Sequence, residues 1–378
     1  MPTLMKIGYD AKRAFLNSTG LGNYSRWLIK LLASRYPQNT YYLYSPKIRP
    51  GKWPDLLRLI KNVITILPKP GVLTSLWRTK GVVKNLSNDG IDIYHGLSHE
   101  LPLGITTPGI KSVVTIHDLI FMRFPQYFGL ISRAIYKLKV AYACKTANII
   151  IAISQKTKQD LVELLDIAPD KIEVVYQNCD EIFKAPCSDE KKQEIIKKYN
   201  LPGKFILSVG TIEERKNLGL LIEALPLIND IKVVVVGRHT AYASAVKAQL
   251  AKLNITNQVV FLDKVEFADL PVIYQLADVF VYPSKYEGFG IPVLEALNSG
   301  VPVIAATGSC LEEAGGPGSL YVNPDDAAGL AEKIALVLTD NPLREKMIAD
   351  GKEYSRNFDD DKLAAQMMHL YKNLSANA

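Results

Sequence analysis

Residues 282–300, Y-P-S-K-Y-E-G-F-G-I-P-V-L-E-A-L-N-S-G, decide the fold that the sequence predicts. They follow the apolar run Val279–Val281, which indicates a buried strand, and they contain Val293–Leu297, which is typical of a helix. Gly288 and Gly290 lie between the two, and because neither has a Cβ atom the backbone there can approach a ligand closely. The stretch therefore predicts a strand, a ligand-facing turn and a helix.

Two carboxylates flank the expected start of this helix. Pro292 suits a first helical turn because it has no amide hydrogen to leave unpaired, so Glu287 should lie in the loop and Glu295 one turn inside the helix. Unpaired amides at a helix N-terminus bind anions, and carboxylates accept hydrogen bonds from sugar hydroxyls. The pattern fits a phosphate-bearing sugar, although an ordinary strand–turn–helix with solvated acids would look the same.

Length and composition indicate a globular protein of two domains. The chain has 378 residues, of which 48% are apolar and 22% charged. The four cysteines form no C-x-x-C pair, which fits reduced thiols in a cytosolic protein better than disulfides or zinc ligands. We expect no signal peptide, because no charged-then-apolar leader precedes the first strand. No apolar run approaches the ~18 residues of a membrane span, which predicts a cytoplasmic protein, soluble or peripheral on the inner face of the membrane.

Positive charge gathers in the first half of the chain. Residues 1–190 hold 25 Lys and Arg against 15 Asp and Glu, whereas residues 191–378 hold 20 against 23. The asymmetry predicts an anionic partner such as phosphates or lipid head groups, with an uneven solvated surface as the alternative. Nucleic acid is not expected, because the basic residues are not interleaved with a stacking platform or a recognition motif.

The segment 47–84 mixes Lys and Arg with large apolar residues. Within it, residues 54–67 predict a helix with a wide apolar face and basic flanks. Such a face either packs on a neighbouring sheet as core or lies against an anionic membrane surface. The sequence leaves both interpretations open.

Two other expected strands end in motifs that suit a ligand site. Met5–Asp10 leads into the loop Gly20–Gly22 and then a helix, an arrangement that can direct amides at a phosphate, although a merely tight turn would look the same. The strand 111–116 delivers His117 and Asp118 at its C-terminal end, where ligands of open α/β sheets bind. His117 suits either hydrogen bonding and acid–base chemistry or the capping of a loop.

The alternation of strands and helices predicts an α/β protein built from two Rossmann-like, doubly wound domains that face each other across a cleft. A charged stretch with two prolines near residues 184–204 marks the boundary. We assign residues 1–190 to the N-terminal domain, 191–355 to the C-terminal domain and 356–378 to a final helix. The aspartates that open this helix favour its dipole, and a metal-binding D-x-D is the weaker interpretation because other ligands are lacking.

Taken in order, these motifs resemble those of a known family. The Gly-x-Gly loop, the His-Asp pair, Val209–Asn217 (V-G-T-I-E-E-R-K-N) and residues 287–296 (E-G-F-G-I-P-V-L-E-A) are similar to motifs of retaining glycosyltransferases of the GT-B fold, glycosyltransferase family 4 (glycosyl transferases group 1). The resemblance spans nearly the whole chain, and the E-x7-E element with its embedded G-F-G-x-P is its most specific part. One residue departs from the pattern: Thr211 stands where many relatives have Arg, which places diphosphate binding more heavily on Arg215 and Lys216.

The resemblance implies roles for the residues in the second half of the chain. Arg215 and Lys216 would neutralise the donor diphosphate as its charge grows in the transition state. Glu287 and the amides of residues 288–290 would hold the transferred sugar and its phosphate. Glu295 would bind the ribose hydroxyls.

The remaining roles concern the first half and the base. His117 would contact the sugar near the reacting carbon, with Asp118 as its orienter, and Gly20–Gly22 would border the diphosphate and the acceptor. The loop at Val265 would hold the base, and the final helix would cross back to the N-terminal, acceptor-binding domain. The implied catalytic residues are His117, Asp118, Arg215, Lys216 and Glu287, and the implied donor-binding residues are Gly20, Leu21, Gly22, Thr211, Arg215, Lys216, Val265, Glu287, Gly288, Phe289, Gly290, Ile291 and Glu295.

The implied reaction is the retaining transfer of a hexose from a nucleotide diphosphate sugar, UDP-glucose-like or GDP-mannose, to a saccharide or lipid-linked saccharide in envelope or extracellular polysaccharide assembly. We expect no metal and no cofactor, because basic side chains would neutralise the leaving group. We expect front-face attack, with Glu287 not a covalent nucleophile, since that role belongs to glycosidase-type carboxylate pairs. The alternatives are a nucleotide-sugar epimerase of similar fold and a non-catalytic saccharide-binding protein.

Overall fold

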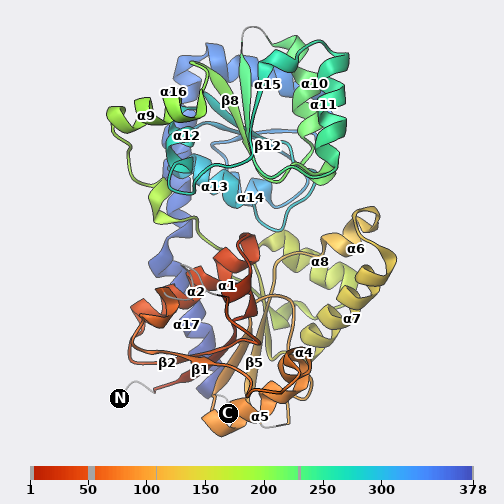
Figure 1. The fold of residues 1–378 in the computed structure, drawn as a ribbon, viewed down its shortest axis with the longest axis vertical. Helices are drawn as coiled ribbons and strands as arrows, with labels where there is room; N and C mark the ends of the chain where they lie inside the picture. The colour runs from red at the N-terminus through yellow and green to blue at the C-terminus, as the bar shows by residue number, and fades with distance from the viewer. Residues whose placement is uncertain (1–3, 50–55, 108, 229–230, 377–378) are drawn as a thin grey trace. The chain divides into compact units, whose positions relative to one another are not determined.

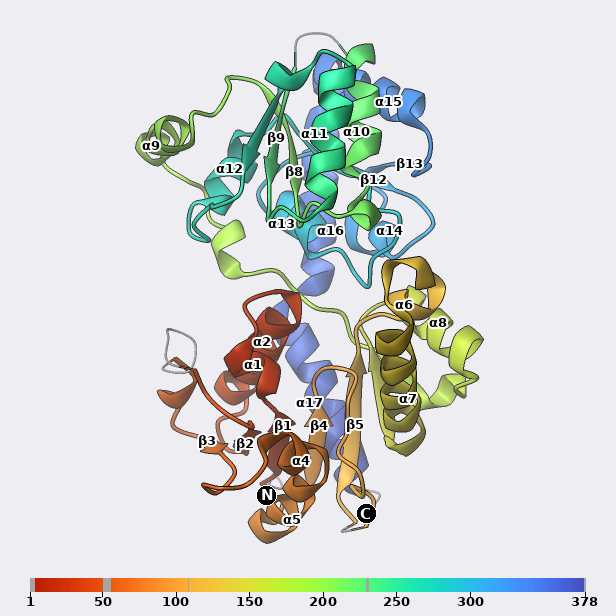
Figure 2. The same ribbon diagram turned by 45° about the vertical axis from the view of Figure 1, so that its right-hand side comes forward.

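The computed structural model describes residues 4–49, 56–107, 109–228 and 231–376, which form two compact α/β units (Figures 1 and 2). Unit 1 comprises residues 1–177 and 359–378, and unit 2 comprises residues 178–358. Residues 178–190, assigned to the first domain from the sequence, belong to unit 2 in the structure. Phe183 in this stretch is fully buried, and its ring lies 5.6 Å from that of Tyr274 in an edge-to-face contact.

Each unit is built on one parallel sheet. Among the described residues, the sheet of unit 1 has the strand order β3-β2-β1-β4-β5-β6-β7 and that of unit 2 the order β10-β9-β8-β11-β12-β13. Both orders reverse direction once, which is the signature of a doubly wound sheet. The strands are β1 (Lys6–Asp10), β2 (Thr40–Tyr44), β3 (Val63–Ile66), β4 (Ile93–Gly96), β5 (Lys111–Ile116), β6 (Ile149–Ala152), β7 (Ile172–Val174), β8 (Phe205–Val209), β9 (Lys232–Val236), β10 (Val259–Leu262), β11 (Val279–Tyr282), β12 (Val303–Ala306) and β13 (Leu320–Val322).

Helices cover both faces of the sheet in unit 1. Apolar side chains of α5, α7 and α8 form one buried cluster with residues of β4, β5 and β6, whereas α2 and α17 pack together on the other face (Figures 1 and 2). The helical elements are α1 (Lys12–Leu16), α2 (Gly20–Arg35), α4 (Thr74–Leu76), the π-helical turn η1 (Trp77–Gly81), α5 (Val82–Asp89), α6 (Ile120–Arg123), η2 (Pro125–Tyr127), α7 (Leu130–Thr146), α8 (Gln155–Leu165), η3 (Pro169–Lys171) and α17 (Asp360–Ala376).

In unit 2, α10, α11 and α15 share a buried apolar cluster with β8, β9 and β11, and α13 packs against α12, α14 and α16. The helical elements are η4 (Glu181–Phe183), α9 (Asp189–Tyr199), η5 (Glu214–Lys216), α10 (Leu218–Ala224), η6 (Leu225–Leu227), α11 (Tyr242–Lys252), η7 (Thr256–Gln258), α12 (Leu270–Leu276), α13 (Ile291–Asn298), α14 (Leu311–Gly315), α15 (Ala327–Thr339), α16 (Asn341–Ser355) and η8 (Arg356–Phe358). The predicted fold class is confirmed: the chain is α/β with two doubly wound parallel sheets.

The final helix, α17, is anchored within unit 1 at both ends of its buried face. The indole of Trp27 donates to Asp360 at 3.0 Å, and Arg35 pairs with Asp361. Further along, the hydroxyl of Tyr371 lies 2.6 Å from Nδ1 of His95 on β4. The aspartate run therefore starts the helix and ties it to α2.

The helix predicted over 54–67 is wrong. Residues 54 and 55 lie outside the described part, and Val63–Ile66 forms the edge strand β3, paired in parallel with β2. The four residues V-I-T-I are mostly β-branched, a composition that favours a strand. The apolar residues that suggested one face of a helix therefore belong to different elements.

The Gly-x-Gly motif also differs from expectation, because helix α2 begins at Gly20 instead of after the motif. A Cβ atom on Gly22 would lie 1.9 Å from the carbonyl oxygen of Asn17. Asn17 also caps this end of the helix, since its side-chain oxygen accepts from the amides of Thr19 and Gly22. The second glycine therefore permits a close backbone approach between the end of α1 and the first turn of α2.

Candidate active site

A cluster of charged side chains lies at the C-terminal ends of β8 and β11 in unit 2. After β8 the chain forms the short turn η5, which carries Arg215 and Lys216. Asn217 ends this turn in a left-handed conformation (φ 57°), and its side-chain amide donates to the carbonyl oxygens of Pro283 (3.1 Å) and Pro324 (2.7 Å). This amide fastens the turn to the loop after β11, so both cations are held over that loop.

Four side chains converge on one oxygen of Glu287. Its Oε1 lies 2.6 Å from Nζ of Lys216 and 2.9 Å from Nη1 of Arg215. The same oxygen accepts from the hydroxyl of Ser284 at 2.5 Å and from that of Tyr282 at 3.2 Å. Both cations therefore contact the same carboxylate oxygen.

Electrostatics keep this cluster ionised. Burial by itself would raise the pKa of Glu287, but the neighbouring Lys216 and Arg215 lower that pKa to about 2. Burial would lower the pKa of Arg215, yet Glu287 and Glu213 together raise it, and Glu213 accepts from its Nη2 at 2.6 Å. The side chains of Arg215 and Lys216 keep 16% and 18% of their exposure, so an anion can still reach them.

The glycine-lined loop next to Glu287 is held rigidly. Gly290 has φ 117°, a conformation that side chains disfavour, and a Cβ atom there would lie 2.8 Å from Leu311. The buried thiol of Cys310 donates to the carbonyl oxygens of Glu287 and Phe289, both at 3.0 Å. These contacts fix the backbone that runs from Glu287 to the start of α13.

Glu295 takes part in a separate hydrogen bond. It lies in α13, which begins at Ile291, and its carboxylate accepts from the hydroxyl of Tyr274 at 2.8 Å. Burial raises the pKa of Glu295 to about 7, against the opposing effect of this hydrogen bond. The carboxyl group is therefore poised to change charge near neutral pH.

The other expected donor contacts of unit 2 lie in loops at the same edge of the sheet. Thr211 follows β8 and precedes the turn that carries Arg215, and Val265 lies in the loop between β10 and α12. Both are half-buried. Because parallel strands end at one edge of a sheet, both loops lie at the same edge of the unit 2 sheet as the charged cluster.

In unit 1, His117 follows β5 and is buried. Its Nε2 donates to the carbonyl oxygen of Leu97 at 2.9 Å, and the ring packs edge-to-face on Tyr24 of α2 at 4.7 Å. Burial, helped by the nearby His99, lowers the pKa of His117 to about 3. The imidazole is therefore neutral at physiological pH, with the proton on Nε2.

Asp118 and the glycine motif also belong to this end of unit 1. The side-chain oxygen of Asp118 accepts from the amide of Ile120 at 3.1 Å and so helps to start α6. Tyr24, which contacts His117, lies one turn beyond Gly20–Gly22 on α2. The structure thus brings His117 next to α2, the helix that begins with the Gly-x-Gly motif.

Sequence reasoning missed several residues of these two groups. Tyr282 and Ser284 contact Glu287, yet the quoted stretch offered only their position at the end of a strand as a signal. Cys310 and His99 gave no signal, because nothing in the local sequence relates Cys310 to Glu287 or His99 to His117, whose rings lie 5.3 Å apart. These contacts arise from tertiary packing.

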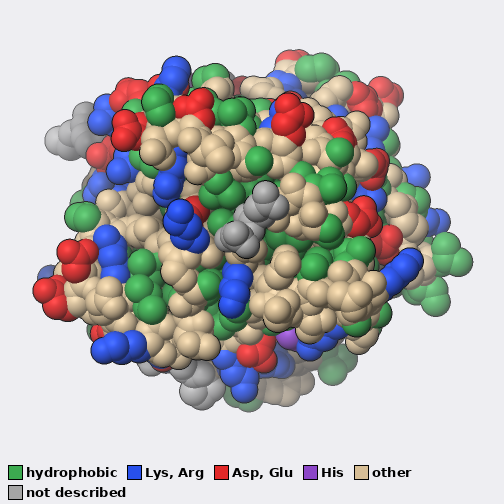
Figure 3. Space-filling model, turned by 90° about the horizontal axis from the view of Figure 1, so that it is seen from above, with side chains coloured by type: hydrophobic (Ala, Val, Ile, Leu, Met, Phe, Trp, Pro, Cys, Tyr) green, Lys and Arg blue, Asp and Glu red, His purple; other side chains and the backbone are tan. Residues whose placement is uncertain are grey.

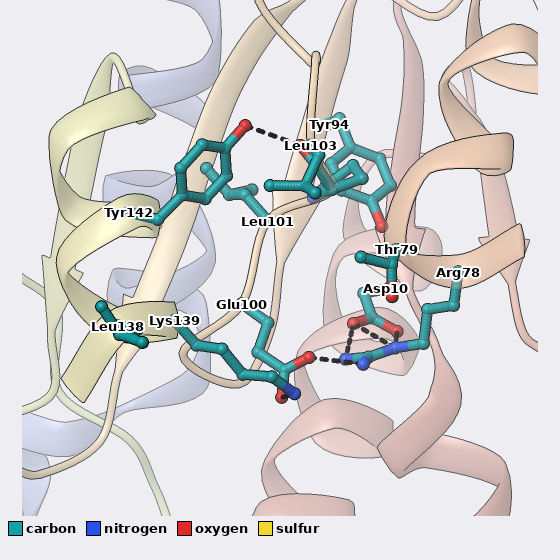
Figure 4. Close-up of a pocket in the computed structure, with 11 residues that line it drawn as sticks. Asp10, Arg78, Thr79, Tyr94, Glu100, Leu101, Leu103, Leu138, Lys139 and Tyr142 are labelled. Carbon is teal, nitrogen blue, oxygen red and sulfur yellow. Dashed lines mark hydrogen bonds and ion pairs between the residues drawn. The ribbon is translucent and has the colours of Figure 1, made fainter. Parts of the chain in front are cut away.

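A pocket of about 280 Å³ lies beside the end of β1 in unit 1 (Figure 4). Arg78 crosses its wall, with Nη2 at 2.5 Å from Asp10 and Nη1 at 2.5 Å from Glu100, and Lys139 lies 3.2 Å from Glu100. The lining residues are Asp10, Arg78, Thr79, Tyr94, Glu100, Leu101, Pro102, Leu103, Leu138, Lys139 and Tyr142.

Throughout the described ranges, every helix is too short or too polar to cross a bilayer. In the same ranges no group of three or more His, Cys, Asp or Glu side chains is arranged to hold a metal ion.

Comparison with known proteins supports the resemblance inferred from the motifs. The family Glycosyl transferases group 1 matches residues 190–354, and Glycosyltransferase Family 4 matches residues 19–180. O-antigen chain mannosyltransferase B of Escherichia coli is 29% identical over 287 residues, 74% of each chain. Serotype-specific mannosyltransferase WbdA of Escherichia coli is 30% identical over 284 residues, which cover 71% of this chain and 34% of WbdA.

Solved structures show the same fold over the full length. A glycosyltransferase from Rickettsia africae ESF-5 superposes with a TM-score of 0.79 at 20% identity and covers 100% of both chains. Anabaena HepE, solved in complex with UDP and glucose, has a TM-score of 0.75 at 18% identity and covers 98% of this chain and 100% of its own. The chain is therefore a GT-B glycosyltransferase that belongs to glycosyltransferase family 4, the glycosyl transferases group 1.

Proposed function

We propose that this glycosyltransferase moves a hexose, with retention of configuration, from a nucleotide diphosphate sugar to a saccharide or lipid-linked saccharide during envelope or extracellular polysaccharide assembly. The observation that carries the proposal is the convergence of Arg215 and Lys216 on Glu287 beside a glycine-lined helix start. Two cations next to a helix N-terminus suit a diphosphate, and an ionised carboxylate suits sugar hydroxyls.

The chemical roles follow from the charges. As the bond to the donor phosphate breaks, negative charge grows on the leaving diphosphate, and Arg215 and Lys216 stabilise it without the reorganisation that water would need. Glu287 holds the sugar and keeps both cations in place. A carboxylate whose pKa is about 2 and whose Oε1 meets four polar side chains is a weak nucleophile, which favours front-face attack, with the departing phosphate accepting the proton of the acceptor hydroxyl.

Unit 1 supplies neutral polar groups. The Nδ1 atom of the uncharged imidazole of His117 can accept a hydrogen bond from a sugar hydroxyl, and the neutral ring places no charge near the reacting carbon. Gly20–Gly22, at the start of α2, borders the diphosphate and acceptor, with the amide of Gly22 itself paired to Asn17. Because basic side chains neutralise the leaving group, the proposal includes no metal ion and no cofactor.

Two donors have specific support. The relatives named above as mannosyltransferases favour GDP-mannose, and HepE, solved with UDP and glucose, supports a UDP-hexose as the second candidate. We propose a cytoplasmic location at the inner face of the membrane, where a lipid-linked acceptor is accessible. The segment 47–84 is part of the surface that we expect to face the membrane.

The test is a donor screen followed by a transfer assay. A donor present at 100 times its Kd should raise the free energy of unfolding by ~2.7 kcal/mol, so GDP-mannose, UDP-glucose, UDP and GDP are compared by thermal shift. The stabilising donor, labelled in its sugar, is then incubated with saccharide and lipid-linked acceptors, and NMR assigns the product anomer. An inverted anomer overturns the retaining mechanism, and epimerisation of donor without acceptor identifies an epimerase. Binding of glycans with neither transfer nor hydrolysis of any donor identifies a saccharide-binding protein.

A further inference from the structure

Helix α7 exposes a large apolar surface. Four of its apolar residues are largely exposed to solvent: Leu130 (74%), Ile131 (79%), Leu138 (73%) and Ile135 (48%). Leu130, Ala134 and Leu138 follow one another at four-residue intervals, with Ile131 and Ile135 beside them, so all five lie on one face. We call this face the α7 stripe.

The α7 stripe is not the face that packs on the sheet. The opposite face of the helix carries Val140, Ala143 and Cys144, which are buried in the apolar cluster of unit 1. A helix on the surface of a soluble domain normally has one apolar face and one polar face. Here both faces of α7 are apolar, and the fold of unit 1 accounts for only one of them.

The charges of α7 have a single sign. Residues 130–146 include Arg133, Lys137, Lys139 and Lys145 and no Asp or Glu. Lys137 and Lys139 flank the α7 stripe on its two sides, with Lys139 also 3.2 Å from Glu100, and Lys145 lies about two turns beyond Leu138. By contrast, the face in Figure 3 mixes Lys and Arg with Asp and Glu and shows apolar side chains scattered among them.

The α7 stripe adjoins the pocket of unit 1. Leu138 belongs to both, and Lys139 and Tyr142 of the same helix also line the pocket (Figure 4). Leu103, 45% exposed, forms another part of the lining. A partner seated on the α7 stripe would therefore lie next to a cavity that combines charged and apolar walls.

We propose that the α7 stripe docks on the surface of an anionic lipid bilayer. Exposed Leu and Ile flanked by Lys, with no acidic residue on the helix, is the pattern of helices that lie in the membrane interface, where apolar side chains enter the acyl boundary and cations contact lipid phosphates. A protein partner would need acidic groups matched to individual lysines, whereas a bilayer presents negative charge along the whole helix. The biological use of this docking, access to a lipid-linked acceptor, rests on the proposed function.

Vesicle sedimentation of the full chain tests the proposal. The wild type is mixed with vesicles of phosphatidylcholine with phosphatidylglycerol and with vesicles of phosphatidylcholine alone. We expect binding to the anionic vesicles only, weakened by salt. The Ile131→Ser/Ile135→Ser variant should bind at least tenfold more weakly, because it removes two exposed apolar anchors that take no part in the core or the pocket.

Two matched variants serve as controls. Leu227→Ser/Leu336→Ser removes two exposed apolar side chains of unit 2, 61% and 43% exposed, and should bind vesicles like the wild type. Leu73→Ser/Leu76→Ser removes two exposed apolar side chains within the segment 47–84. We expect this variant to lose less vesicle binding than Ile131→Ser/Ile135→Ser. Circular dichroism and thermal unfolding establish that each variant is folded.

Several results would overturn the proposal. They are an absence of wild-type binding to anionic vesicles, equal binding by the wild type and the α7 variant, a loss of binding in Leu73→Ser/Leu76→Ser that exceeds the loss in the α7 variant, and a wild-type dimer in analytical ultracentrifugation that the α7 variant abolishes. Failure of the proposed function is distinguishable from failure of this proposal, because the protein would then transfer no sugar while still binding vesicles. The α7 variant should transfer sugar to a soluble acceptor as the wild type does.

Discussion

Each unit has a buried polar group, and the two groups differ in ionisation: one is charged and the other is neutral. In unit 2, Arg215, Lys216 and Glu287 are ionised together. In unit 1, His95 and His117 are neutral, because burial lowers the pKa of each to about 3. Glu287, His95 and His117 are all buried, so burial by itself does not decide whether a group is ionised or neutral.

The difference lies in the partners. Glu287 has two cations within 3 Å, and their attraction exceeds the cost of removing the carboxylate from water. The histidines have neutral partners: His95 meets the hydroxyls of Tyr371 and Thr115 at 2.6 and 2.8 Å, and His117 meets the carbonyl of Leu97. A neutral hydrogen bond satisfies a buried imidazole without a charge. We therefore propose that the ionised group of unit 2 holds phosphate and that the neutral group of unit 1 holds uncharged hydroxyls.

The largest expected effect comes from breaking the ionised group. Glu287→Ala and Lys216→Ala should each reduce sugar transfer by on the order of 100-fold or more, because they act on developing charge or on the sugar's position. Steady-state kinetics with the stabilising donor measure this. Lys285→Ala is the control, since this neighbouring lysine pairs with Asp325 instead of Glu287. Unchanged turnover in either of the first two variants would remove that residue from the site.

A smaller change keeps the charges and removes one hydroxyl. Tyr282→Phe deletes the group that accepts from Lys216 at 2.5 Å and donates to Glu287 at 3.2 Å. Hydrogen bonds to charged groups contribute about 1.5–3 kcal/mol, so we expect kcat/KM to fall about tenfold. If kcat/KM stays at the wild-type value, the carboxylate is positioned by Lys216 and Arg215 without help from the tyrosine.

The neutral histidines predict that unit 1 is sensitive to acid. Their folded pKa values lie below the unfolded value near 6.5, so the stability they contribute is present above pH 6.5 and is lost as the pH falls toward 3. Each proton taken up on unfolding changes the free energy by about 1.4 kcal/mol per pH unit. Hydrogen exchange at pH 7.5 and pH 5 should show protection falling in β4 and β5 more than in β11. The reverse order would contradict the assigned charge states.

Glu295 predicts a weaker dependence of opposite sign. Its raised pKa means that the stability it contributes is present below its unfolded value near 4.3 and is lost as the pH rises through about 7. We propose that Glu295 binds the ribose hydroxyls, and it should do so better when ionised, so the KM for the donor should rise several-fold between pH 8 and pH 6. Glu295→Gln should flatten this profile. A profile that Glu295→Gln leaves intact would assign the pH dependence to another group.

The smallest expected effect concerns metal. EDTA should leave transfer largely intact, because the two cations of unit 2 neutralise the leaving group. The measurement is activity before and after chelation and dialysis. Complete loss of activity that Mg²⁺ or Mn²⁺ restores would revive Asp359–Asp361 as a metal site, against their contacts with Trp27 and Arg35.

The local sequence determined the elements on which both groups depend. Alternating strands and helices, the turn at Gly288–Gly290 and the helix start at Pro292 were predictable because they follow from backbone preferences over a few residues. Residues 54–67 were misassigned as a helix, since apolar spacing in a short run cannot distinguish a helix from an edge strand when the pairing partner, β2, lies elsewhere in the chain.

Only the tertiary structure decided which side chains meet and what charge they carry. Lys216 and Glu287 are 71 residues apart, and Cys310, which contacts the Glu287 loop, lies just before α14. The pKa of Glu287 falls and that of Glu295 rises, although the two lie on one short segment, because Glu287 faces two cations, whereas burial dominates at Glu295. A carboxyl group's charge depends on its surroundings within a few ångströms, and long-range packing supplies those surroundings.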